Sequence, residues 1–172
     1  EPIVPKFELL KATASGRLLG FDAYKKGINY LAVTYANTPE GQQAQKMVNE
    51  MLPKLENAEF ANDSISDHFK VVFQFDRTKT DKIETFKTTL DEVLENVRYY
   101  KLKSSVDIYD TNTTFVVVHG LRNAQVAKTF DQILLDKDVK KIKEPYFAVS
   151  SANYQILQIH KNLETYLNLN NQ

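Results

Sequence analysis

The sequence predicts an α+β fold in which a helical segment, residues 1–57, precedes a mixed domain, residues 68–172. Three observations support this prediction. Apolar residues recur at steps of three and four from Phe7 to Leu55, which is the period of a helix with one buried face. A polar, helix-poor stretch, 57–67, marks the boundary. After it, short runs rich in aromatic and β-branched residues, typical of strands, alternate with helical patterns.

The helical segment is predicted to contain three short helices that share an apolar core. We expect burial of four side chains spaced three or four residues apart, namely Tyr24, Ile28, Leu31 and Tyr35. Thr38 is a typical N-cap and Pro39 suits the first turn, so a new helix is expected to begin there. Three short helices bury little surface alone, and we expect them to end a longer repeat array.

The mixed domain is predicted to form an antiparallel sheet covered on one face. The expected strands are Phe69–Phe75, Ser104–Tyr109, Thr114–His119 and Tyr146–Ser150. The expected helices are Asp81–Tyr100 and Asn123–Leu135 on that face, and then a final helix over Ala152–Leu169. The order β-α-β-β-α-β, with right-handed crossovers, is that of the ferredoxin-like fold. The sequence therefore predicts a ferredoxin-like domain with a C-terminal helix.

Composition excludes several classes of function. The chain has 22 Lys and Arg residues and 22 Asp and Glu residues, and this zero net charge argues against nucleic acid as the main partner. It contains no Cys, which excludes disulfides, thiolate catalysis and zinc–thiolate sites. No apolar run reaches the roughly 20 residues that span a bilayer. The chain begins at Glu1 without a signal-peptide pattern, and we expect either a processed protein or, by preference, a fragment of a longer protein.

No catalytic, cofactor-binding or metal-ligating residue is predicted. The histidines His68, His119 and His160 stand at no metal-ligand spacing, and we expect them to be structural or exposed. The pair Ser150-Ser151 has no Gly-x-Ser-x-Gly motif around it, and Ser151 suits the cap of the final helix. The lysine-rich run 137–143 is interpreted as a solvated loop, with a polyanion contact as the alternative. We therefore expect a protein that is not an enzyme.

One face of the predicted sheet is a candidate partner-binding face. Strand Phe69–Phe75 places its odd-numbered residues on the side that the two helices should cover. Val72, Val116 and Val118 are expected to alternate onto the opposite side. Soluble proteins usually cover or use an apolar patch of this kind. We expect the final helix to cover it, or else the N-terminal helices or a partner, and any uncovered remainder to be the partner surface.

Two stretches resemble known repeat and glycan-binding families. Tyr24–Ala44, with the turn Tyr35-Ala36-Asn37-Thr38-Pro39-Glu40-Gly41, resembles the tetratricopeptide (TPR) repeats of bacterial envelope proteins, with Ala36 at the usual first Pro. Thr114–Leu134, which contains FVVVHGLRNA, resembles the second half of a SPOR domain. That second resemblance implies an alternative function, peptidoglycan binding. A glycan site would need polar and aromatic groups along a groove, whereas a protein-docking face needs apolar area.

A third resemblance extends over nearly the whole chain. Tyr146–Leu163 reads YFAVSSANYQILQIHKNL and resembles the C-terminal part of the large TPR lipoproteins of gliding motility and type IX secretion in Bacteroidota (the SprE/PorW family). The resemblance implies a non-catalytic periplasmic scaffold without a cofactor, in a full-length protein anchored to the outer membrane as a lipoprotein. Its implied partners are other protein components of the envelope secretion and motility complex.

Overall fold

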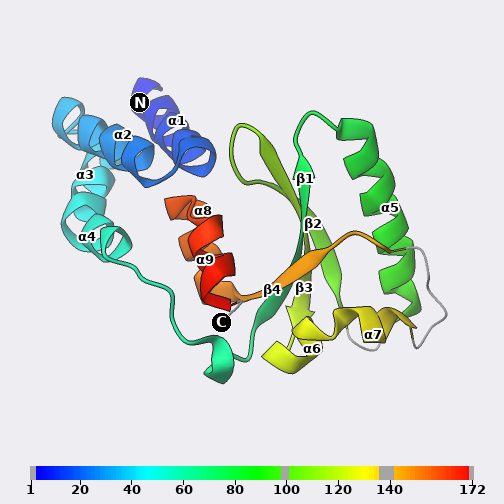
Figure 1. Cartoon of the computed structure of the whole chain (residues 1–172). Coiled ribbons are helices and arrows are strands. Elements are labelled where there is room, and N and C mark those ends of the chain that lie inside the picture. The colour runs from blue at the N-terminus through cyan, green and yellow to red at the C-terminus, as the bar shows by residue number, and fades with distance from the viewer. Residues whose placement is uncertain (1–2, 98–100, 136–141, 171–172) are drawn as a thin grey trace. The chain divides into compact units, whose positions relative to one another are not determined.

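The structure is a computed structural model that describes residues 3–97, 101–135 and 142–170 (Figure 1). The chain forms two compact units. The helical unit is Glu1–Phe60 together with Gln155–Gln172, and the sheet unit is Ala61–Tyr154. This division differs from the predicted one, because the last residues of the chain belong to the helical unit and not to the mixed domain.

The helical unit consists of helices from both ends of the chain. Its elements are α1 (Val4–Leu19), α2 (Phe21–Thr34), α3 (Pro39–Lys46), the π-helical η1 (Met47–Met51), α4 (Leu52–Glu56), the later part of α8 (Ser151–His160) and α9 (Leu163–Asn170). The predicted start of α3 is confirmed. The Thr38 hydroxyl caps the helix by accepting a hydrogen bond from the Gly41 amide at 3.1 Å, and Pro39 occupies the first turn.

Small residues allow α1 and α2 to pack closely. A Cβ placed on Gly27 would lie 2.6 Å from the Cβ of Ala12, so a larger residue there would force the helices apart. Gly20 joins the two helices with a φ of 94°, a left-handed conformation that L side chains rarely adopt. The two glycines therefore fix the close approach and the reversal of the chain, although each weakens an isolated helix.

The core of the helical unit contains two of the four predicted side chains. Ile28 and Leu31 are fully buried and pack with Ala12, Phe21, Ala32, Ala44 and Leu52. Tyr24 and Tyr35, which we also expected to be buried, are half-buried and pack at the rim of this core. A phenol hydroxyl loses less free energy when it stays near water, which explains the position of both tyrosines.

The sheet unit has four strands, each antiparallel to its neighbours. The strands are β1 (Phe69–Asp76), β2 (Lys103–Ile108), β3 (Thr113–Leu121) and β4 (Tyr146–Ser150), in the spatial order β2-β3-β1-β4. Three helices lie on one side of the sheet, α5 (Thr80–Asn96), α6 (Ala124–Lys128) and α7 (Phe130–Leu135) (Figure 1). The predicted α+β class and the four predicted strands are confirmed, with small shifts at the strand ends.

The predicted helices differ from the observed ones at three places. The predicted helix Asp81–Tyr100 is α5 as far as Asn96, and residues 98–100 lie outside the described residues. The predicted helix Asn123–Leu135 is two helices, because the Thr129 backbone leaves the helical region after α6. The predicted final helix is also two helices, and the break falls at Lys161, which has a φ of 55°. Its ammonium donates to the Arg17 carbonyl at 2.6 Å.

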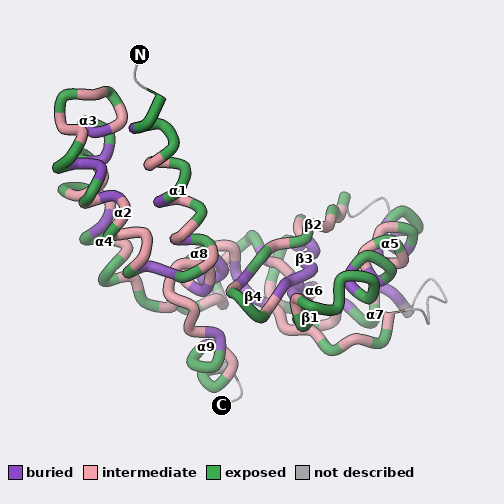
Figure 2. Tube along the Cα trace, turned by 90° about the horizontal axis from the view of Figure 1, so that it is seen from above, coloured by how far each residue is buried: buried purple, intermediate pink, exposed green. Residues whose placement is uncertain are grey.

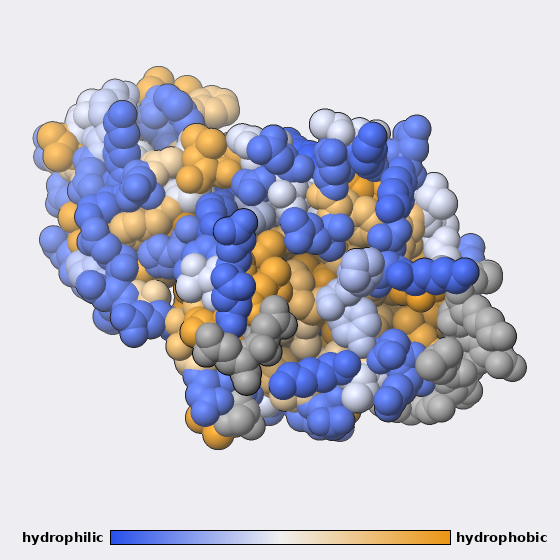
Figure 3. Space-filling view, viewed as in Figure 1, coloured by the Kyte–Doolittle hydropathy of each residue, from blue (hydrophilic) through white to orange (hydrophobic). Residues whose placement is uncertain are grey.

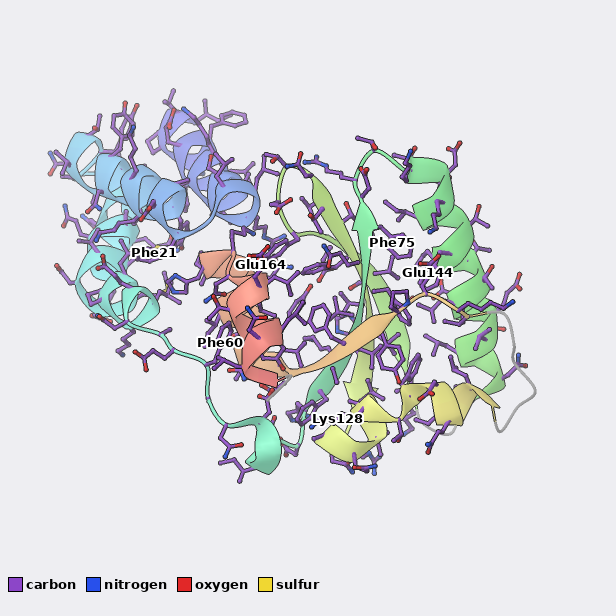
Figure 4. The ribbon with its side chains drawn as sticks, viewed as in Figure 1. Phe21, Phe60, Phe75, Lys128, Glu144 and Glu164 are labelled. Atoms are coloured by element: carbon purple, nitrogen blue, oxygen red, sulfur yellow. The ribbon has the colours of Figure 1, made fainter. Side chains whose placement is uncertain are left out.

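The core of the sheet unit lies between the sheet and its helices, as predicted. Alternate β1 residues face α5, α6 and α7, and buried positions follow the strands (Figure 2). The cluster includes Phe69, Val71, Phe73, Phe75, Phe86, Leu90, Phe130 and Leu134. The Phe73 ring lies 4.9 Å from the Phe86 ring. At the end of β1, Lys82 lies over the Phe75 ring at 5.5 Å and pairs with Glu144 at 2.8 Å (Figure 4).

The predicted partner-binding face is wrong for two of its three residues. Val118 pairs with Val71, and Val116 pairs with Phe73, so both valines lie in the core under the helices. Val72 pairs with Val117 and lies on the opposite side. The side toward which each residue points could not be read from the sequence, because residues 115–118 are apolar without alternation and the strand is buried on both faces.

Candidate functional site

The second face of the sheet, opposite α5 to α7, carries an apolar cluster. Val72, Val117 and Phe115 lie there and are fully buried. The Tyr109 ring stacks on the Phe115 ring with centroids 4.5 Å apart, and the Phe147 ring meets it edge-on at 6.1 Å. The aromatic groups on this face are therefore occupied with one another and form part of the core.

A chain of polar side chains lies beside that cluster on the same face. The Lys70 ammonium is 2.8 Å from Nδ1 of His119, and Nε2 of His119 is 2.7 Å from the Ser105 hydroxyl. Ser105 donates to Asp107 Oδ1 at 2.9 Å, and the Tyr154 hydroxyl donates to Asp107 Oδ2 at 2.6 Å. We call these five residues the polar chain; they join β1, β2, β3 and the start of α8 within the sheet unit.

The direction of each hydrogen bond follows from the groups involved. A protonated lysine only donates, so Nδ1 of a neutral His119 accepts and the ring proton sits on Nε2. Nε2 then donates to Ser105, whose hydroxyl proton is directed to the Asp107 carboxylate. Burial, together with the charge of Lys70, lowers the pKa of His119 and favours this neutral ring. Burial also lowers the pKa of Lys70, while Asp107 opposes that change.

The polar chain places a serine beside a histidine, but in the wrong protonation state for nucleophilic catalysis. A serine nucleophile needs a ring nitrogen that accepts its proton, and here Nε2 of His119 donates to Ser105. The arrangement instead links a cation to a carboxylate through two neutral groups, with the internal donors and acceptors matched. Its physical effect is to fix the side chains of β2 against β1 and β3.

The other two histidines have separate roles. Nε2 of His160 lies 2.7 Å from the Leu55 carbonyl, and its ring packs on Phe21 at 5.5 Å inside the helical unit (Figure 4). His68 is exposed, 3.7 Å from the Asp67 carboxylate. Across the described residues, no group of three or more His, Asp or Glu side chains could hold a metal ion. Of the three histidines, only His119 joins a cluster of functional groups.

The start of α8 is capped by Ser150, whereas the sequence predicts Ser151 as the cap. Ser150, one residue before the predicted cap Ser151, accepts a hydrogen bond from the Asn153 amide at 3.1 Å. Asn153 is buried and holds the segment that leads into the sheet: its side-chain amide donates to the Ala61 carbonyl at 2.9 Å, and its oxygen accepts from the Ala61 amide at 2.9 Å. These contacts are those of a capped helix start and a clamped loop.

A shallow open cavity lies between α5 and β2. It measures about 500 Å³ and is lined by Lys87, Asp91, Leu94, Glu95, Lys101, Leu102, Lys103 and Ser104. Asp91 is engaged by Lys87 and by the Ser104 hydroxyl, and these hydrogen bonds hold the pKa of Asp91 below its usual range although burial opposes them. The mixed charges of the lining select neither an anion nor a cation.

The helical unit exposes an apolar stripe at its N-terminal end. Ile3, Val4, Phe7 and Leu10 follow one another at helical spacing, and we call them the α1 stripe. Phe7 is 59% exposed and Leu10 is 64% exposed. Apolar side chains gather on the surface where α1 begins (Figure 3). The opposite face of α1 packs through Pro5, Ala12 and Gly16, so the stripe is left without a cover within the described residues.

Sequence reasoning missed both the polar chain and the α1 stripe. The sequence does carry signals of the polar chain: Lys70 interrupts an apolar strand, and Ser105 and Asp107 alternate on another.

No described helix is both long and apolar enough to span a bilayer. Comparison of the chain with protein-family models, with curated proteins and with solved structures finds no match.

Proposed function

We propose that this chain is a non-catalytic protein-interaction module, a scaffold piece in which a TPR-like helical unit offers a docking surface. The observation that carries the proposal is the α1 stripe, four apolar side chains exposed on one helix face. In stacked helical repeats, each helix pair covers the apolar face of its neighbour. An exposed stripe of this spacing therefore suits an amphipathic helix of a partner or of an adjoining repeat.

The arrangement of the sheet unit supports a ferredoxin-like assignment as part of this proposal. Helix α5 connects β1 to β2 across one intervening strand, and α6 with α7 connects β3 to β4 across another. Two such crossovers over an antiparallel sheet are the features of the split β-α-β arrangement. In the proposal this unit is a structural domain of the scaffold, with no catalytic role.

The resemblance of Tyr146–Leu163 motivates a more specific setting, a periplasmic component of gliding motility and type IX secretion. In that setting the partners are other proteins of the envelope complex. The alternative, peptidoglycan binding, would need aromatic groups open to a glycan. Tyr109, Phe115 and Tyr154 on the second face are buried, which favours the protein-interaction proposal.

Site-specific photo-crosslinking tests the proposal. A photoreactive phenylalanine analogue replaces Phe7, and in a matched control it replaces Lys26, which is exposed on α2 of the same unit. Both proteins are irradiated with an envelope fraction of a gliding Bacteroidota species. We expect a discrete protein adduct at position 7 and a much weaker one at position 26. Equal labelling at both positions, or none at position 7, would reject the α1 stripe as a docking surface.

A further inference from the structure

Strand β2 is an edge of the sheet and has the features of a pairing surface. It lies at one end of the strand order, so the backbone groups of alternate residues point away from β3. Val106 is 48% exposed and Ile108 is 46% exposed, both on the side of the sheet that carries the helices. An edge with exposed apolar side chains is a template for another strand.

We propose that β2 pairs with β2 of a second copy of this chain, antiparallel about a two-fold axis at Ser105, so that two sheets join into one of eight strands. Two copies related by a two-fold axis present the same patch to each other. An axis between antiparallel edge strands stands normal to the sheet. It therefore places opposite one another only residues that lie on the same face.

The charges of β2 select the register. With the axis at Ser105, Lys103 lies opposite Asp107 of the second copy, and symmetry repeats the pair. Moving the axis to Val106 places Lys103 opposite Tyr109 and Asp107 opposite Ser105, which removes both ion pairs. Moving it to Ser104 brings Asp107 opposite Lys101, whose left-handed backbone, with a φ of 54°, is not that of a strand. Opposite charges directly across a strand pair are favourable, and like charges are not.

The same register accounts for the exposed apolar side chains. Val106 comes to lie opposite Ser104 of the second copy, and Ile108 opposite Leu102, so both gain neighbours on the side that carries the helices. On the second face, the polar chain already fixes the Asp107 carboxylate through Ser105 and Tyr154. A carboxylate held in place loses little freedom when a lysine of the second copy approaches, which favours association.

Charge reversal at Lys103 tests the pairing. Sedimentation equilibrium of the wild-type chain is expected to show a species of twice the 19.8 kDa chain mass, with a dissociation constant that the ionic strength affects. Lys103→Glu turns two opposite-charge contacts into like-charge contacts and is expected to weaken the dimer about tenfold or more. Lys128→Glu makes the same charge change at an exposed site on α6 and should leave the constant unchanged.

Cysteine crosslinking tests the register, because the chain has no Cys of its own. Under mild oxidation, Ser105→Cys should form a disulfide-linked dimer, since residue 105 lies opposite itself at the axis. Thr88→Cys on the exposed face of α5 should form no disulfide-linked dimer. A wild-type chain that remains monomeric at about 1 mM would overturn the proposal. A dimer that tolerates Lys103→Glu and leaves Ser105→Cys uncrosslinked would overturn it as well, because it must use another surface.

Discussion

The two units of this protein bury their apolar residues to different extents. The sheet unit buries valine and phenylalanine side chains on both faces of β1 and β3. The helical unit buries one side of α1 and exposes the α1 stripe on the other. Buried apolar side chains stabilise the fold, whereas an exposed apolar stripe is a surface that soluble proteins usually cover or use. The comparison separates side chains that stabilise a core from an exposed apolar stripe, which the proposed function takes as a docking surface.

The largest expected loss in the free energy of unfolding comes from a charge placed in the core of the sheet unit. Val118→Asp would place a carboxylate in the core under α5 to α7, and we expect a loss of about 4 kcal/mol or more in the free energy of unfolding. Val106→Asp, at an exposed position of β2, should change it by less than about 1 kcal/mol. Urea denaturation followed by circular dichroism measures both. Equal losses would contradict the assignment of Val118 to the core.

A smaller loss in the free energy of unfolding is expected from a cavity in the core of the helical unit. Ile28→Ala removes a fully buried side chain and should cost about 2–4 kcal/mol, since the surrounding helices cannot close the cavity completely. Val33→Ala on the exposed face of α2 is the matched control and should leave the unfolding free energy within about 0.5 kcal/mol of the wild type. A control as damaging as Ile28→Ala would show that the outer face of α2 is covered.

The helix cap of α3 should contribute less to the free energy of unfolding than the buried side chain of Ile28. Thr38→Ala removes the hydroxyl that accepts from the Gly41 amide, and we expect a loss of about 1 kcal/mol. Thr38→Ser keeps that oxygen and should retain most of the stability. The pair can be compared by thermal unfolding under identical conditions. If alanine and serine behave alike, the cap is not what stabilises the start of α3.

The polar chain predicts a dependence on pH. The pKa of His119 in the folded protein lies below its ordinary value, because burial and the neighbouring Lys70 oppose protonation. The unfolded chain therefore takes up the proton first as pH falls, so the stability is fully present above about pH 6.5 and declines below it. His119→Gln should remove this part of the decline. Unfolding free energies of both proteins between pH 8 and 5 give the difference, which separates His119 from carboxylates that titrate in the same range.

Local sequence patterns predicted which segments form strands and helices. They predicted less well which face of the sheet a side chain occupies and where a helix breaks. Tyr146–Ser150 was predicted with its observed bounds, because aromatic and β-branched residues stand between clear turn signals. The side on which Val116 and Val118 lie depends on the register with β1, which the uninterrupted apolar run does not encode. The helix breaks at Lys161, whose ammonium contacts the Arg17 carbonyl, and the sequence near residue 161 carries no signal of a partner so far away.

The candidate site was harder to predict than the fold. The members of the polar chain come from β1, β2, β3 and α8, and only strand pairing brings Lys70 beside His119 and Ser105. The exposure of Phe7 and Leu10 was hidden in the sequence because the apolar period of α1 is the same whether a stripe is buried or open. Tertiary packing decides both features, and neither is a property of a single segment.

The most direct test of the central claim is the affinity of the helical unit for the protein that photo-crosslinking at position 7 identifies. Isothermal titration compares the wild-type chain with the Phe7→Glu, Leu10→Glu double variant, whose substitutions lie at exposed positions and should leave the unfolding free energy within about 1 kcal/mol of the wild type. We predict at least a tenfold rise in the dissociation constant, because two charges would enter an apolar contact. An unchanged dissociation constant would contradict the claim that the α1 stripe recognises the partner.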